Sequence, residues 1–232
     1  MKNVKKSIHD GHRQRLRDRY TEQGPDTFKD HELLELLLSY SIAQKDTNPL
    51  GHDLLTQFGD LRGVFEAEPE ELMKVPGIGE RSAFLLKLIP GLTRRYYEQL
   101  SDSTNLLSET PKQIEFFIPR FIDRKRECLF AAFLDRNYRL IKCELQYEGS
   151  INAVEIHSDR ILRTALKLGA AKLIVAHNHF SDAYPSEDDI NATRHLFYKL
   201  GDHEISLLDH IVVCGTSATS MKESGHFAKA TY

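Results

Sequence analysis

One stretch decides how this sequence folds: Lys172-Leu-Ile-Val-Ala-His177-Asn-His179-Phe-Ser-Asp-Ala-Tyr-Pro-Ser186-Glu-Asp-Asp189-Ile. Its apolar start predicts a short buried strand that delivers two histidines at positions i and i+2, so that both side chains share one face. Ser186 and the acids after it predict a helix start, because serine is a good N-cap and acids suit the positive helix end. Asp189 then lies in the first turn of that helix, and the loop before the helix is long enough to turn the chain back toward the two histidines.

The chemistry of this stretch points to a metal. His177, His179 and Asp189 have the composition of a catalytic zinc site, in which three nitrogen and carboxylate ligands leave a fourth position for water. Zinc lowers the pKa of a bound water to about 7, and a carboxylate must still take and return a proton. Glu144, flanked by apolar residues on a preceding strand pattern, is the candidate. The Ser186 hydroxyl could hold a developing oxyanion.

A second motif lies in the N-terminal half, Val75-Pro76-Gly77-Ile78-Gly79-Glu80-Arg81-Ser82-Ala83. It resembles a helix-hairpin-helix, in which the two glycines let backbone N–H groups approach a DNA phosphate whatever the base sequence. The resemblance assigns Gly77, Gly79 and Arg81 to a weak DNA contact. Such hairpins also serve as packing elements or protein contacts, and the basic residues 2–19 suit either phosphate contact or a solvated face.

The hydrophobic patterns divide the chain into two halves. Helical periods occupy residues 30–38 and 49–58, whereas strand patterns at 128–134, 138–147 and 205–213 alternate with a helical pattern at 158–168. Residues 101–109 are polar, lack a helical period and predict a linker. We therefore predict a small all-α domain over residues 1–100, a linker at 101–109 and an α/β (α+β) domain over 110–232.

Composition excludes some classes of protein. The 232 residues are 41% hydrophobic, enough for a substantial core, yet no apolar run reaches the roughly 18 residues of a membrane helix. The polar first residues lack the apolar core of a signal peptide, so we expect a cytoplasmic protein without membrane contact. Three widely spaced cysteines predict free thiols, and a net charge of −3 restricts any nucleic-acid binding to local basic patches.

At these residues the C-terminal half resembles the JAB/MPN metalloprotease domain, and the whole chain resembles the RadC family. The JAB signature, a distant Glu followed by His-x-His and Ser-x-x-Asp, is met by Glu144, His177, His179, Ser186 and Asp189. The resemblance implies a mixed sheet flanked by helices, one Zn²⁺ per chain held by the two histidines and Asp189, Glu144 as general base, and Ser186 as oxyanion aid. It differs at Phe180, where the family has proline before a longer loop.

Some assignments stay open at this point. Glu148 and Glu155 compete with Glu144, although only Glu144 stands five residues before Gly149, as the resemblance requires. Strand parity would let Glu148 face the same side as Glu144. His210, within Leu208-Asp209-His210, is interpreted first as a structural residue at a strand end. The contiguous His-Asn-His differs from the dispersed residues of HNH nucleases, so that class is set aside.

Two functions from different classes follow. The first is a zinc-dependent JAB-type hydrolase that cleaves a peptide or isopeptide-like amide in a peptide or protein substrate and is brought to DNA or a DNA-associated partner by the N-terminal half. The second is a non-catalytic accessory of DNA repair or recombination, in which the JAB domain binds partners. Glu144→Gln discriminates them, because only the hydrolase needs that carboxylate.

Overall fold

The computed structural model describes residues 8–43, 45–103, 106–149 and 154–226. Contacts divide the chain into two compact units, residues 1–92 and 93–232. None of the helices in the described ranges is long and apolar enough to cross a membrane.

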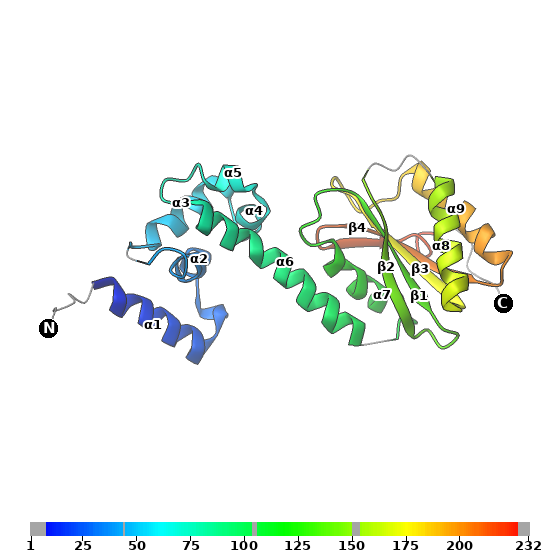
Figure 1. Ribbon diagram of the computed structural model, residues 1–232, viewed down its shortest axis with the longest axis horizontal. Helices are drawn as coiled ribbons and strands as arrows, with labels where there is room; N and C mark the ends of the chain where they lie inside the picture. Colours follow the sequence, from blue (N-terminus) through cyan, green and yellow to red (C-terminus); the bar gives the residue numbers. More distant parts are fainter. Residues whose placement is uncertain (1–7, 44, 104–105, 150–153, 227–232) are drawn as a thin grey trace. The chain divides into compact units, whose positions relative to one another are not determined.

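The first unit is all helical (Figure 1). Its core contains Leu34, Leu38, Leu54 and Leu72, each at most 1% exposed, because leucines at helical spacing place their side chains on one buried face. The predicted helical periods are observed, and Gly59, with φ of 90°, ends the second of them. The helices are α1 Ile8–Gln23, α2 Asp30–Leu38, α3 Asn48–Phe58, α4 Leu61–Glu66, α5 Pro69–Leu72 and the start of α6 Glu80–Ser103, with a short 3-10 helix η1 Pro25–Thr27.

The second unit is built on a five-stranded mixed sheet in the order β2-β1-β3-β4-β5. The β3–β4 pair is parallel and the other pairs are antiparallel. This arrangement places β3, the strand of the opening stretch, at the centre of the sheet. The strands are β1 Cys128–Leu134, β2 Leu140–Glu148, β3 Lys172–Asn178, β4 Ser206–Cys214 and β5 Ser217–Ser220.

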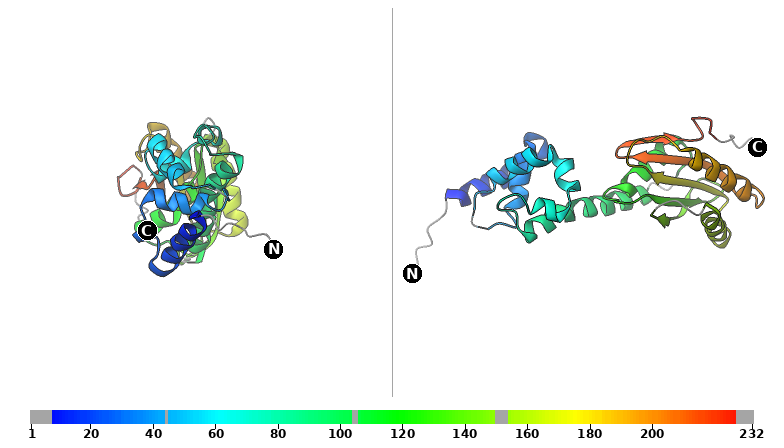
Figure 2. Two further views of the ribbon diagram at one scale, coloured as in Figure 1. Left: turned by 90° about the vertical axis from the view of Figure 1, so that its left-hand side faces the viewer. Right: turned by 90° about the horizontal axis from the view of Figure 1, so that it is seen from above.

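Helices cover both faces of this sheet. Figure 1 and the right-hand view of Figure 2 show α8 Val154–Leu168 and α9 Glu187–Gly201 on the face away from α7 Thr110–Phe117. The first face buries α8 and α9 against alternate strand residues such as Phe133 and Val175. The second buries α7 and the 3-10 helix η2 Ile118–Phe121 against the intervening residues, such as Ile174. The predicted fold class, helices followed by a mixed sheet flanked by helices, is confirmed.

The structure differs from the expectation around the predicted linker. Residues 101–103 belong to α6, which continues through Pro90. Leu106 bridges to Arg139, and Leu107 is 2% exposed, because its apolar side chain packs into the core beside α7. The exact limits of the two domains and the linker stay a prediction. The short strand β5 was not expected from the sequence.

Candidate metal centre

The end of β3 and the start of α9 bring three candidate ligands together. His177 is the penultimate residue of β3, and the backbone of His179 continues the pairing by donating to the Val213 carbonyl at 2.8 Å. Because the two histidines are two residues apart on an extended chain, their rings point the same way. Asp189 reaches them from the first turn of α9. Neighbouring strands hold β3 on both edges, so the ligand positions rest on the rigid centre of the sheet.

The donor atoms are spaced as a metal requires. His177 Nε2 lies 2.9 Å from His179 Nε2 and 3.2 Å from Asp189 Oδ1, and His179 Nε2 lies 3.2 Å from Asp189 Oδ2. Zinc–nitrogen bonds of 2.0–2.1 Å in a tetrahedron place neighbouring ligand atoms about 3.3 Å apart. The side chains of His177, His179 and Asp189 are 2%, 15% and 7% exposed. These residues therefore fit a zinc ion, and the structure groups them as a possible metal site.

Ser186 sets the orientation of the carboxylate ligand. Its side chain caps α9 by accepting from the Asp189 N–H at 3.2 Å, and its hydroxyl and backbone N–H donate to Asp189 Oδ2 at 2.6 and 2.8 Å. Burial alone would raise the pKa of Asp189, but the neighbouring His177 and Ser186 outweigh it and hold the pKa well below its usual range. The side chain of Asp189 is thus an ionised carboxylate, as a metal ligand requires. The oxyanion role of Ser186 stays a prediction, since its hydroxyl proton here is directed to Asp189.

Glu144 lies on the face of the sheet that carries His177, but further along the strands. It pairs with Ala131 of β1, which pairs in turn with Val175, one side-chain step before His177. Its carboxylate forms an ion pair with Lys142. The hydrogen bond from Lys142 lowers the pKa of Glu144 against the opposing effect of burial, so the group is a carboxylate at neutral pH. Its assignment as general base stays a prediction.

A β-bulge separates Glu144 from its main competitor. The register shifts between Leu129 and Phe130, so Glu148 pairs with Cys128 and lies on the opposite face from Glu144. The expectation from strand parity that both glutamates face one side is therefore wrong, because an extra residue in β2 reverses the alternation. Glu148 is 43% exposed and contacts Arg124 at 3.7 Å. The side chain of Glu155 lies outside the described residues.

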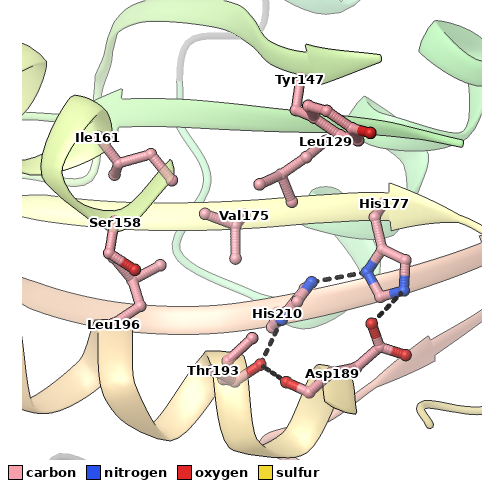
Figure 3. Close-up of a pocket in the computed structure, with 11 residues that line it drawn as sticks. Leu129, Tyr147, Ser158, Ile161, Val175, His177, Asp189, Thr193, Leu196 and His210 are labelled. Carbon is pink, nitrogen blue, oxygen red and sulfur yellow. Dashed lines mark hydrogen bonds and ion pairs between the residues drawn. The ribbon is translucent and has the colours of Figure 1, made fainter. Parts of the chain in front are cut away.

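The structure adds a residue that sequence analysis missed as part of the site. His210 on β4 is 5% exposed, and its Nε2 lies 2.7 Å from His177 Nδ1 (Figure 3). On its other side, Nδ1 lies 2.5 Å from the Thr193 hydroxyl of α9. Burial lowers the pKa of His210, and the adjacent His177 lowers it further, so the ring is neutral at neutral pH. His210 reaches His177 because β4 pairs in parallel with β3, and sequence periodicity does not show which strands pair.

An apolar cavity lies behind these polar groups. Its volume is about 60 Å³, and Leu129, Ile161, Val175 and Leu196 line most of it (Figure 3). The imidazoles of His177 and His210 form one wall. Two of the candidate ligands, His177 and Asp189, therefore border an apolar cavity.

The residues predicted to contact DNA lie in the first unit, where they differ in backbone conformation and exposure. Gly77 and Gly79 lie in the turn between α5 and α6, and Gly77 has φ of 101°, a conformation that favours glycine. A Cβ on Gly79 would have no atom within 4 Å, so the backbone there is open. Arg81 is exposed at the start of α6. Of the basic N-terminal residues, Arg13 is 9% exposed and donates to the Ala43 carbonyl at 2.6 Å, so it has a structural role.

Comparison with known proteins agrees with the fold. The family described as RadC-like JAB domain matches residues 107–226, and the family described as UPF0758 N-terminal matches residues 9–84. A UPF0758 protein of Bordetella petrii is 36% identical over 91% of this chain and 95% of its own length. A UPF0758 protein of Vibrio campbellii is 32% identical over 90% of this chain and 94% of its own length. The chain therefore belongs to the RadC family, with a RadC-like JAB domain following a UPF0758 N-terminal region.

Proposed function

We propose that this protein is a zinc-dependent hydrolase of JAB type that cleaves a peptide or isopeptide-like amide. The observation that supports it is the convergence of two imidazoles on one carboxylate: the Nε2 atoms of His177 and His179 lie 2.9 Å apart, and each lies 3.2 Å from one oxygen of Asp189, Oδ1 and Oδ2 respectively. Two imidazoles and a carboxylate are a donor set typical of catalytic zinc, and three protein ligands leave a position for water. None of the three described cysteines forms a disulfide, which favours a reducing compartment such as the cytoplasm.

Each candidate site residue has its own role in this proposed reaction. When bound, zinc supplies Lewis acidity and activates a water molecule near neutral pH. His177, His179 and Asp189 hold the ion, and Ser186 fixes the Asp189 carboxylate. Glu144 takes the proton from the water and returns it to the leaving amine. To do so its side chain must leave Lys142 and turn toward the ligands along the face it already shares with His177.

The loop beside the centre suits a peptide substrate. Phe180 and Tyr184 are 61% and 73% exposed, so two large apolar side chains stand in solvent between His179 and Ser186. Tyr184 N donates to Asp182 Oδ1 at 2.9 Å, which gives this loop a defined turn. Exposed aromatic residues next to a buried polar site are typical of surfaces that bind peptide side chains.

Metal removal tests the proposal. We expect the full-length protein to hydrolyse a mixed set of linear and isopeptide-linked peptides, to fall to background after chelation, and to recover on adding one equivalent of zinc. Magnesium should not restore hydrolysis, because Mg²⁺ prefers oxygen ligands and an octahedral shell. Mass spectrometry of the products measures the outcome. Hydrolysis that survives complete chelation would contradict a zinc mechanism.

A second candidate is the non-catalytic accessory, in which the JAB domain binds partners. One observation favours it: the Glu144 carboxylate is paired with Lys142 rather than placed among the candidate ligands. The metal site would then stabilise the fold without catalysing a reaction. Glu144→Gln separates the two candidates, as argued in the Discussion.

We also propose a weak, sequence-independent DNA contact through the open backbone at Gly79 and the exposed Arg81. Binding to duplex DNA should weaken steeply with salt, because phosphate contacts release counterions. Arg81→Ala should reduce the slope of log affinity against log salt by about 1, whereas Arg136→Ala, in the other unit, should leave it unchanged. Fluorescence anisotropy over a salt series measures this. Absence of binding at low salt, or binding insensitive to salt, would refute the contact.

A further inference from the structure

A buried glutamine without a hydrogen-bond partner for its side chain lies next to the candidate general base. Gln146 of β2 is 2% exposed, and among the described residues neither polar atom of its side-chain amide has a partner. Arg160 of α8 donates to the backbone carbonyl of Gln146 at 3.1 Å, so α8 packs against this part of β2. Buried amides are nearly always hydrogen-bonded, because burial without a partner is costly. The side chain of Gln146 is therefore able to take a further partner.

The β-bulge in β2 places this amide on the same face as Glu144. Gln146 is the extra residue of the bulge, opposite the step from Leu129 to Phe130 in β1. It follows Glu144 by two residues, and alternate residues of a strand share a face. The amide of Gln146 also lowers the pKa of the Glu144 carboxyl, which indicates that the two side chains are close together.

Lys142 and Gln146 lie on opposite sides of Glu144 along the strand. Lys142 comes two residues before Glu144, and Gln146 comes two residues after it. The next residue, Tyr147, is in the same row of the sheet as His177, because both pair with one residue of β1. Gln146 is therefore on the side of Glu144 that leads to the candidate metal ligands, and Lys142 is on the other side.

We propose that Gln146 is a positioning residue, which accepts the Glu144 side chain as a hydrogen-bond partner when Glu144 leaves Lys142 and holds it toward the candidate metal ligands. The inference rests on the proposed function, in which Glu144 is the general base. Gln146 Nε2 donates to one oxygen of the carboxylate, and the other oxygen keeps its lone pairs for the proton of the water. Gln146 acts only through Glu144.

The resting ion pair is weak enough to be exchanged for this contact. The side chains of Lys142 and Glu144 are 53% and 29% exposed, and ion pairs near solvent contribute little to stability. The move to Gln146 gives up that pair and forms a charge-assisted hydrogen bond to a buried amide, which is one of the stronger kinds. Besides Lys142, the charged group that acts on Glu144 is Arg160 of α8, which favours the ionised carboxylate.

NMR of the side-chain amide tests the contact without hydrolysis. In the metal-free full-length protein, Lys142→Met removes the outer partner of Glu144, so the carboxylate should move to Gln146. We expect a side-chain N–H proton of Gln146 to shift downfield in this variant, and the shift to disappear when Glu144→Ala is added. The spectrum of Gln146→Met assigns the signals. Lys167→Met, which removes an exposed lysine at the end of α8, should leave the Gln146 signals unchanged.

Hydrolysis by the zinc-loaded protein gives a second readout. Gln146→Met keeps the length of the side chain but removes its donor, and it should lower kcat about 10-fold with KM unchanged, as expected for one lost charge-assisted hydrogen bond. The acid limb of its pH profile should move to higher pH, because a carboxylate that loses a donor has a higher pKa. Lys142→Met should instead raise kcat. Near-ultraviolet circular dichroism checks that each variant is folded.

The outcomes separate this inference from the proposed function. Unchanged Gln146 amide signals in folded Lys142→Met would overturn the contact, whatever the activity. An unchanged kcat and pH profile in folded Gln146→Met would overturn the positioning role. Amide signals that depend on Glu144, in a protein that hydrolyses no peptide, would support the contact and refute the proposed function.

Discussion

His177→Ala is expected to abolish zinc binding. The variant leaves only His179 and Asp189 of the three converging candidate ligands. It also removes the hydrogen-bond partner of the buried His210 imidazole. Wild-type protein with zinc at 100 times its dissociation constant should gain about 2.7 kcal/mol of unfolding free energy, which is several degrees in the melting temperature. His177→Ala should gain nothing.

Elemental analysis and thermal melts with and without zinc measure this result. His195→Ala is the matched control, because His195 is an exposed histidine on α9 outside the ligand group. The control should bind one zinc per chain and show the wild-type shift in melting temperature. If His177→Ala retained one tightly bound zinc, the ion would have to lie elsewhere, and the assigned ligands would be wrong.

Glu144→Gln should keep zinc and lose hydrolysis by about 10²–10⁴-fold, the usual range for a general acid–base. Glutamine preserves the shape of the side chain but cannot take a proton. Zinc content should not change, since Glu144 is absent from the ligand group and is paired with Lys142. While Glu144 is paired with Lys142, that hydrogen bond lowers the pKa of Glu144, so the resting group is already a carboxylate at neutral pH.

Glu148→Gln is the control for this experiment. It makes the same chemical change four residues away, but the bulge places Glu148 on the opposite face of the sheet. Its activity should equal that of the wild type. If Glu144→Gln hydrolysed peptides as fast as wild type, another group would be the base. If the wild-type protein showed no hydrolysis and Glu144→Gln bound partners as well as wild type, the accessory function would be favoured.

The fold and the ligand group were largely predictable because they depend on local patterns. The apolar run before His177, the i, i+2 spacing to His179 and the N-cap at Ser186 are all properties of neighbouring residues. They survive in the structure as β3 and the start of α9. The change from helical to strand periodicity likewise predicted the order of the two units.

The parts that sequence analysis missed depend on how distant strands pair. His210 reaches His177 only because β4 lies parallel to β3, and no local period shows which strands are neighbours. The face of Glu148 was mistaken because one extra residue in β2 forms a bulge, which a simple two-residue alternation does not anticipate. In each case tertiary pairing overrode the local pattern.

Anomalous X-ray scattering at the zinc edge, from crystals of the zinc-loaded protein, tests the metal centre most directly. The account predicts one strong peak per chain, bounded by His177 Nε2, His179 Nε2 and the Asp189 carboxylate, with about 2.0–2.2 Å to each ligand atom. Zinc-loaded crystals without a peak at these three residues would contradict it.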